Sequence, residues 1–124
     1  MSTTKSETPK LLYKETVSME DRTKEAERIL VKFPTRRPII VEQLPKCLLP
    51  PMTKNKFLVP EDLTMGQFMY NVRKRIALKP SEAIFLFAGE NIMSSSQTIS
   101  QVYNDHKDTD GFLYLKLTTE NTFG

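Results

Sequence analysis

The sequence is poor in the residue types that most catalytic and metal sites need. It contains one cysteine, Cys47, one histidine, His106, and four glycines among 124 residues. A single cysteine excludes an internal disulfide and favours a reducing compartment. The chain has no cysteine and histidine cluster at metal-ligand spacing and no glycine-rich phosphate loop. Cys47 and His106 are a conceivable nucleophile and base, but no catalytic motif surrounds Cys47. We therefore expect neither an enzyme nor a bound cofactor or metal.

Long apolar runs are also missing. The apolar run Ile84 to Ala88, like every other in the chain, is far shorter than the roughly 20 residues of a membrane-spanning helix. Residues 1–10 are polar and lack the apolar core of a secretory signal, so we expect them to form a disordered tail. A chain of 124 residues fits one domain with one core.

Positive charge is concentrated in the first two thirds of the chain. Residues 1–80 carry 16 lysines and arginines against 9 acidic residues, whereas residues 81–124 carry 2 against 6. This asymmetry favours an acidic partner, such as nucleic acid, an anionic membrane or an acidic protein tail. Solvation of helix surfaces by the same cations is the simpler alternative. The run Arg73 to Arg75 motivates a nucleic-acid module, but the aromatic residues fall at core-like spacing instead of forming exposed stacking platforms, so we expect no nucleic-acid partner.

Apolar spacing predicts a helix and then two strands in the first half of the chain. Four apolar residues recur at i, i+3, i+4 and i+7 from Ala26 to Phe33, which predicts an amphipathic helix over residues 20–33, ended by Pro34. Residues 36–44 and 56–59 are runs of β-forming residues bounded by prolines. We expect them to pair as two strands despite the long connection between them.

The second half alternates helices with strands. A capping box at Thr64 and Gln67 begins a predicted helix over residues 65–76. A strand over residues 84–88, a turn, a short helix over 98–106, a strand over 112–117 and a polar tail complete the order. This order favours an α+β fold in which one helix crosses a sheet. The crossover places strand 84–88 in the same sheet as strand 56–59 and parallel to it, a β-grasp arrangement with an added helix in front.

Several motifs then carry a family resemblance. The phrase F-L-V-P-x-D-L-T-x-G-Q-F runs from Phe57 to Phe68 and is followed by R-K-R-I at Arg73 to Ile76. Together with Y-K-E from Tyr13, R-x-P-I-I-V-E from Arg36, F-L-Y from Phe112 and the terminal Phe123-Gly124, they resemble the autophagy ubiquitin-like modifiers of the GABARAP type. The likeness extends over nearly the whole chain, from about Leu12 to Gly124.

The resemblance implies a ubiquitin-like β-grasp fold with two additional N-terminal helices. With the patterns above, it divides the chain into a disordered tail over residues 1–10, a helical subdomain over 11–35, a β-grasp core over 36–118 and a flexible conjugation tail over 119–124. It implies a protein that is cytoplasmic and monomeric when soluble. Once conjugated, it would reside on the autophagosome membrane and recruit cargo receptors and autophagy factors.

The resemblance also assigns chemistry to the C-terminus. Gly124 would be conjugated to phosphatidylethanolamine, and a cysteine protease of the family would recognise Phe123 and Gly124. Activating and conjugating enzymes would be partners. A glycine without a Cβ suits a terminus that must thread a narrow catalytic groove, and the polar stretch from Thr118 to Thr122 is expected to be solvated. The chain ending at Gly124 is either a processed mature form or one encoded ready for conjugation.

A docking site for short motifs, aromatic-x-x-aliphatic, is the second implication. Residues 56–59 have the marks of an edge strand, which can accept an extended peptide as an added strand. By resemblance, a first pocket takes the aromatic ring and comprises Glu25, Ile29, Pro38, Ile40, Lys56, Leu58 and Phe112. A second pocket takes the aliphatic residue and comprises Phe57, Val59, Pro60, Leu63, Phe68 and Val72. Arg36, Lys56 and Arg75 would meet acidic residues that flank the motif.

Two residues depart from the family pattern at this docking site. Asn71 stands where the family usually has an apolar residue of the second pocket, and Gly111 stands where an aromatic residue is common.

Tubulin is a further candidate partner, because the basic front helices of the family can meet acidic tubulin tails. The alternative for Arg22, Lys24, Arg28 and Lys32 is an ordinary solvated helix face.

Overall fold

The computed structural model describes residues 12–44, 52, 54–76 and 82–119, and its elements follow the predicted order. They are α1 (Tyr13–Thr16), α2 (Met19–Lys32), β1 (Arg36–Gln43), β2 (Lys56–Pro60), α3 (Met65–Lys74), β3 (Ile84–Ala88), β4 (Asn91–Ile92), α4 (Ile99–His106) and β5 (Leu113–Thr119). Each predicted helix and strand is present, with ends shifted by at most two residues. The α+β class and the two N-terminal helices are confirmed. The two-residue strand β4 was predicted only as part of a turn.

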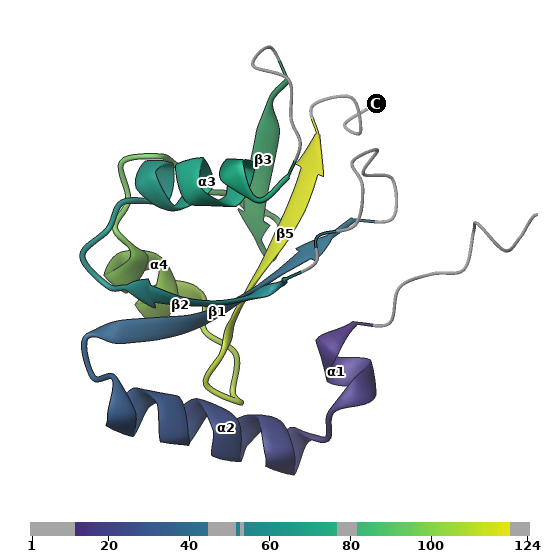
Figure 1. The fold of residues 1–124 in the computed structure, drawn as a ribbon, viewed down its shortest axis with the longest axis vertical. Helices are drawn as coiled ribbons and strands as arrows, with labels where there is room; N and C mark the ends of the chain where they lie inside the picture. The colour runs from purple at the N-terminus through teal and green to yellow at the C-terminus, as the bar shows by residue number, and fades with distance from the viewer. Residues whose placement is uncertain (1–11, 45–51, 53, 77–81, 120–124) are drawn as a thin grey trace, which may run out of the picture.

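The strands form one sheet in the order β2-β1-β5-β3-β4 (Figure 1). Strand β1 pairs antiparallel with β2, from Arg36 opposite Pro60 to Ile40 opposite Lys56, and this confirms the predicted strand pair. Strand β5 lies parallel to β1 and antiparallel to β3. Strands β2 and β3 therefore run in the same direction within one sheet, as the predicted crossover through α3 requires. Strand β2 lies at one edge.

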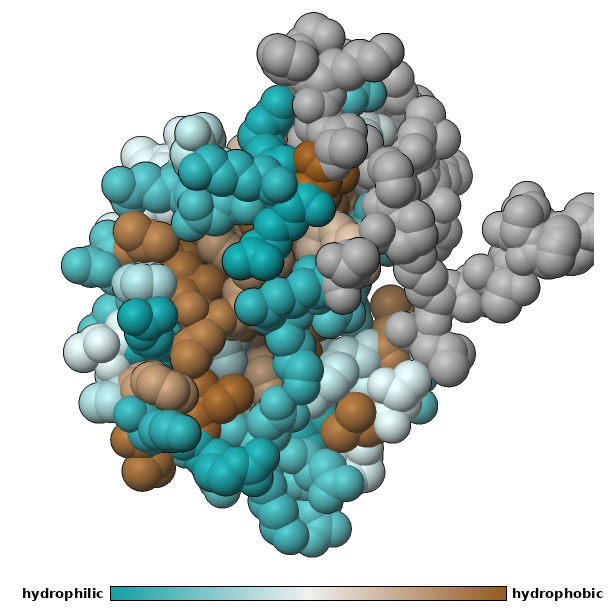
Figure 2. Space-filling view, viewed as in Figure 1, coloured by the Kyte–Doolittle hydropathy of each residue, from teal (hydrophilic) through white to brown (hydrophobic). Residues whose placement is uncertain are grey.

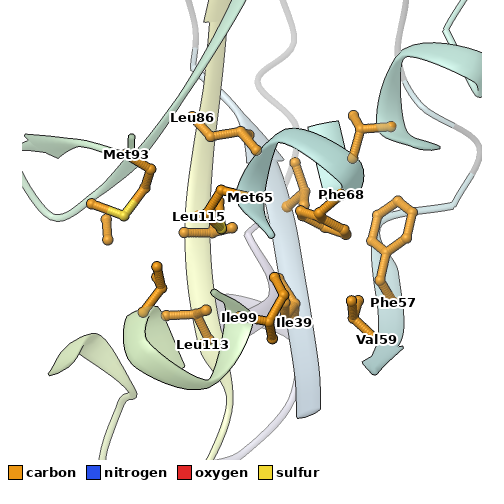
Figure 3. Close-up of a cluster of buried hydrophobic side chains, with 14 of the residues drawn as sticks. Ile39, Phe57, Val59, Met65, Phe68, Leu86, Met93, Ile99, Leu113 and Leu115 are labelled. Atoms are coloured by element: carbon orange, nitrogen blue, oxygen red, sulfur yellow. The ribbon is translucent and has the colours of Figure 1, made fainter. Parts of the chain in front are cut away.

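The main core lies between the sheet and the helices α3 and α4. Alternate residues of the strands point to this side, among them Ile39, Phe57 and Leu115, and belong to one cluster with Met65 and Phe68 of α3 (Figure 3). The rings of Phe57 and Phe68 pack edge to face with centroids 5.4 Å apart, a preferred aromatic geometry. A second, smaller cluster of buried residues lies on the opposite face, where α2 packs on β1.

Side-chain caps define where the helices begin. The Ser18 hydroxyl accepts a hydrogen bond from the Asp21 backbone N–H at the start of α2. At α3 the predicted capping box is present, because Thr64 Oγ1 accepts from the Gln67 N–H and the Gln67 side chain accepts from the Thr64 N–H. The same arrangement recurs at Thr98, where α4 begins. Each cap satisfies backbone donors that the first helical turn leaves unpaired.

A buried ion pair joins the N-terminal helices to the sheet. The Arg22 side chain of α2 is 9% exposed, and its Nε donates to Oδ2 of Asp110, which is fully buried, at 2.8 Å. The same guanidinium donates to the backbone carbonyls of Lys14 and Val17. The alternative given above for Arg22, an ordinary solvated helix face, is therefore wrong, because its charge is paired inside the protein. This pairing fixes α2 against the turn before β5.

Gly111 allows that turn to approach α2 closely. Its φ of +96° is a conformation that L side chains rarely adopt, and a Cβ there would lie 2.8 Å from the Cβ of Ala26. The absence of an aromatic side chain at this position therefore has a local cause.

Strand β5 extends further than predicted. Thr118 and Thr119 were expected in or at the start of the polar tail, but both belong to β5 and are buried, Thr119 with 8% exposure. Their cross-strand partners are Phe85 and Ile84 of β3. A β-branched threonine fits a strand between neighbours, so the expected tail begins at least one residue later, after Thr119.

Among the described residues, no helix is long and apolar enough to span a membrane.

Candidate functional site

The candidate site is the outer edge of β2. Within the part of the chain that the structure describes, β2 pairs only with β1. Its other edge leaves backbone donors and acceptors available to an extended peptide. Figure 2 shows a band of apolar residues over this edge, between α3 and α2 at the left of the view.

The side chains of β2 alternate between the two faces of the sheet. Phe57 and Val59 are buried in the main core beneath α3. Lys56 and Leu58 are half-buried on the opposite face, where Leu58 lies across from Pro38 in the register. An edge strand with this alternation has an apolar wall on each side, as the two predicted pockets require.

A groove of about 290 Å³ lies between β2 and α3. Five of the six predicted second-pocket residues line it. The sixth, Val72, is fully buried in the core behind the groove and does not reach its surface. Leu58, assigned by resemblance to the first pocket, also lines this groove. The complete lining is Lys54, Phe57, Leu58, Val59, Pro60, Leu63, Phe68, Asn71, Lys74 and Arg75.

Two of these lining residues, Lys54 and Lys74, were missed in the sequence analysis. Lys54 precedes β2 and Lys74 ends α3, so neither falls at an apolar position of its element. The signal that could have found them is their spacing from other positively charged residues in the sequence. Lys74 belongs to the basic run already noted, and Lys54 lies two residues before Lys56 on the way into the strand.

The first-pocket residues gather on the other side of β2. Ile40 and Phe112 are 0% and 1% exposed and, with Ala26, form the small buried cluster of this face. Ile29 of α2 packs against the cluster, and Ile40 lies opposite Lys56 in the register. The buried side chains of Ile40 and Phe112 form the floor of this first pocket. A ligand would first contact the half-buried side chains at its rim.

Tyr13 of α1 completes this site, although the sequence analysis did not include it. Its ring packs edge to face on Phe112, with centroids 5.6 Å apart. Its hydroxyl donates a short hydrogen bond to the Glu25 carboxylate. The Lys56 Nζ lies 2.7 Å from the other Glu25 oxygen and 3.3 Å from the Tyr13 hydroxyl. Three elements, α1, α2 and β2, therefore meet in one polar network above the buried floor.

The network shifts the pKa values of Glu25, Lys56 and Tyr13. Burial alone would raise the pKa of the Glu25 carboxyl, but the hydrogen bonds from Lys56 and Tyr13 outweigh it, so this pKa lies below its usual value. Burial disfavours the charged form of Lys56, yet its hydrogen bonds to Glu25 and Tyr13 raise the pKa of the ammonium. Burial raises the pKa of the Tyr13 hydroxyl, and its bond to Glu25 adds to this. Glu25 and Lys56 are therefore a stable ion pair at neutral pH.

The three cations predicted to flank the docking site lie at different points of it. Arg36 is exposed and lies opposite Pro60, at the end of β2. Arg75 follows α3, and its guanidinium lies 5.5 Å from the centre of the Phe57 ring, near the start of β2. Lys56 already forms an ion pair with Glu25. The cations thus occur near both ends of the edge strand.

The residues of the predicted C-terminal chemistry, Phe123 and Gly124, lie outside the described residues, as does Cys47. Among the residues that the structure describes, no group of three or more histidines, cysteines, aspartates and glutamates could hold a metal ion.

Comparison with known proteins places this architecture in a family. The family model described as autophagy protein Atg8, ubiquitin-like, matches residues 21–124. The chain belongs to the Atg8 family. The resemblance drawn from its motifs, to the ubiquitin-like modifiers of autophagy, is thereby confirmed.

Individual relatives cover nearly the whole chain. Autophagy-related protein 8 of Mycosarcoma maydis is 48% identical over 112 residues, which cover 90% of this chain and 95% of the relative. Autophagy-related protein 8d of Arabidopsis thaliana is 49% identical over 106 residues, which cover 86% and 88%.

Two solved Atg8 structures share the fold of this Atg8-family chain. The crystal structure of Trypanosoma brucei ATG8 matches with a TM-score of 0.85 and 36% identity over 90% of this chain and 97% of the other. Plasmodium falciparum Atg8, solved in complex with a Plasmodium falciparum Atg3 peptide, matches with a TM-score of 0.81 and 28% identity over 89% and 99%.

Proposed function

We propose that this Atg8-family chain is a modifier, not an enzyme, that is attached through Gly124 to phosphatidylethanolamine. On the membrane it binds receptors and autophagy factors that carry aromatic-x-x-aliphatic motifs. The observation that carries the docking half of the proposal is the unpaired edge of β2, with an apolar wall on each side. A peptide added there gains backbone hydrogen bonds from the edge and selectivity from the two walls.

The two walls suit two different side chains. On the α2 side, Ile29, Lys56 and Leu58 lie half-buried around the floor of Ile40 and Phe112, and their apolar surface suits an aromatic ring. On the α3 side, the groove of about 290 Å³ has room for an aliphatic side chain. The complex of Plasmodium falciparum Atg8 with an Atg3 peptide supports peptide binding as a property of this fold, and a conjugating enzyme as one class of partner.

The conjugation half rests on the family and on the residues Phe123 and Gly124. Five residues follow Thr119, the last of β5, so the terminus can extend at most about 18 Å from the sheet. A glycine carboxylate on such a tail can enter a narrow catalytic groove. A phospholipid brings two acyl chains, and two chains hold a protein on a bilayer far more firmly than one. Conjugation would therefore convert a cytoplasmic protein into one fixed on the autophagosome.

Calorimetric titration of one aromatic-x-x-Leu peptide tests the docking half. Leu58→Ala removes an apolar side chain that borders both walls, and it should weaken binding by about 2 kcal/mol, or ~30-fold in Kd. Val31→Ala is the matched control, because Val31 is 82% exposed on α2, and this variant should bind like the parent. Equal affinities for Leu58→Ala and the parent would mean that the docking face is elsewhere.

A further inference from the structure

Among the described residues that line the groove between β2 and α3, Asn71 is the one uncharged polar residue. Asn71 lines the groove beside Phe57 and Phe68, is exposed, and makes no side-chain hydrogen bond to the described residues. Around it lie the cations Lys54, Lys74 and Arg75. None of the described residues that line the groove is acidic, so it joins an apolar floor to a rim of hydrogen-bond donors.

The donors gather at one end of the groove. Helix α3 begins beside the end of β2, where the Leu63 N–H bonds to the Pro60 carbonyl. It ends over the start of β2, where Arg75 lies 5.5 Å from the Phe57 ring centre. Asn71 lies three residues after Phe68 and four before Arg75, on one helix face with both. The groove is therefore apolar near Pro60 and polar near Phe57.

The two pockets also set the direction of a bound motif. The first-pocket side lies nearest Lys56, opposite Ile40, and the second-pocket groove extends to Pro60 and Leu63. A motif in which the aromatic residue precedes the aliphatic one must run from Lys56 toward Pro60, parallel to β2. Alternate residues of an added strand point to the same side. The residue directly after the aromatic one therefore faces α3 with the aliphatic anchor, about 7 Å back along the strand.

We propose that Asn71 and Arg75 together bind a carboxylate at this second motif position, so that the preferred partner is aromatic-acidic-x-aliphatic. The Asn71 amide donates a hydrogen bond to one carboxylate oxygen, and the Arg75 guanidinium pairs with the same group. The methylenes of the acidic side chain lie on the ring of Phe57. An aliphatic side chain at position 71 would offer no donor. This inference rests on the proposed docking at β2 and specifies its partner.

Calorimetry with three peptides that differ only at the second position tests the inference. The peptides carry Glu, Gln or Lys there, with one aromatic residue and one Leu anchor held constant. The parent should bind the Glu peptide about fivefold tighter than the Gln peptide, the scale of a favourable charge pair at an accessible rim. Asn71→Leu should reduce that ratio to about twofold, because Arg75 alone remains, and should bind the Gln peptide as well as the parent does or better.

Two further variants sharpen the result. Asn71→Asp keeps the size and replaces the amide donor by a carboxylate that competes with the peptide for Arg75, so it should bind the Glu peptide no tighter than the Gln peptide. Asn104→Leu changes an exposed asparagine of α4 that does not line the groove, and it should keep the parent ratio. The inference is overturned if the parent binds all three peptides equally, or if Asn71→Leu keeps the parent ratio of Glu to Gln. If none of the peptides binds the parent, the proposed docking at β2 itself has failed.

Discussion

Removal of Asp110 should destabilise the protein more than loss of any surface carboxylate. Its Oδ2 accepts hydrogen bonds from Arg22 Nε at 2.8 Å and from the Tyr114 hydroxyl at 2.6 Å. Its Oδ1 accepts from the Phe112 N–H at 2.8 Å. Asp110→Ala therefore leaves three donors without their acceptor, one of them a buried charge.

The structure sets the size of the effect. Breaking a buried ion pair from one side costs about 3–5 kcal/mol, because the remaining charge is left inside the protein. Arg22 keeps its bonds to the Lys14 and Val17 carbonyls, so we expect the lower end of this range, about 3 kcal/mol. For a chain of this length that corresponds to a fall in Tm of roughly 10–15 °C.

Urea unfolding of Asp110→Ala and the parent measures the loss directly. Asp105→Ala is the control, because Asp105 is exposed on α4 and its removal should change the stability by less than about 0.5 kcal/mol. The double variant Arg22→Met with Asp110→Leu should be more stable than Asp110→Ala alone, since it leaves no unpaired charge. A loss below about 1 kcal/mol for Asp110→Ala would refute the reasoning that this pair holds α2 on the sheet.

Two further predictions concern the charges of α2. Because the folded pKa of Glu25 is lowered, its pairing with Lys56 adds stability that is present above the ordinary carboxyl pKa of about 4.3 and lost as pH falls through the lower folded value. In urea unfolding the stability difference between the parent and Glu25→Gln should therefore be full at about pH 6 and should shrink as pH falls below about 4.3; a difference that persists unchanged in acid would contradict this account. The exposed cations of α2, Lys24, Arg28 and Lys32, should give only weak association with tubulin or anionic vesicles. Co-sedimentation should disappear by ~0.5 M salt, because charges are screened over about 8 Å already at physiological salt; binding that survives this salt would show that these charges are not its cause.

Local signals predicted most of the fold. The spacing of apolar residues around Ala26 predicted α2, and the Thr64 and Gln67 side chains predicted where α3 begins. Strand β4 could not be predicted, because two residues have no periodicity and are held by pairing with Phe87 and Ala88. The burial of Thr118 was missed for a similar reason: its polar side chain suggests solvent, and only the pairing with β3 places it inside.

Long-range contacts account for what the sequence did not predict at the site. Arg22 looked like its basic neighbours in α2, but its partner Asp110 lies 88 residues away. Tyr13 belongs to a four-residue helix that no local pattern identifies, yet it contacts Glu25 and Phe112. The resemblance, by contrast, assigned Phe57 and Leu58 to different pockets, and their side chains do alternate between the two faces of the sheet, because a strand has a fixed period of two. Leu58 nevertheless also lines the groove beside Phe57.

The central claim, that the protein acts as a lipid-conjugated modifier, is tested most directly by its mass after a conjugation reaction. The chain is incubated with Atg8-family activating and conjugating enzymes, ATP and phosphatidylethanolamine vesicles, and the intact product is weighed. We expect a gain of one lipid less one water, since an amide joins the Gly124 carboxyl to the lipid amine, and no gain for a folded Gly124→Ala variant. An unmodified parent, or an equal adduct on Gly124→Ala, would contradict the account.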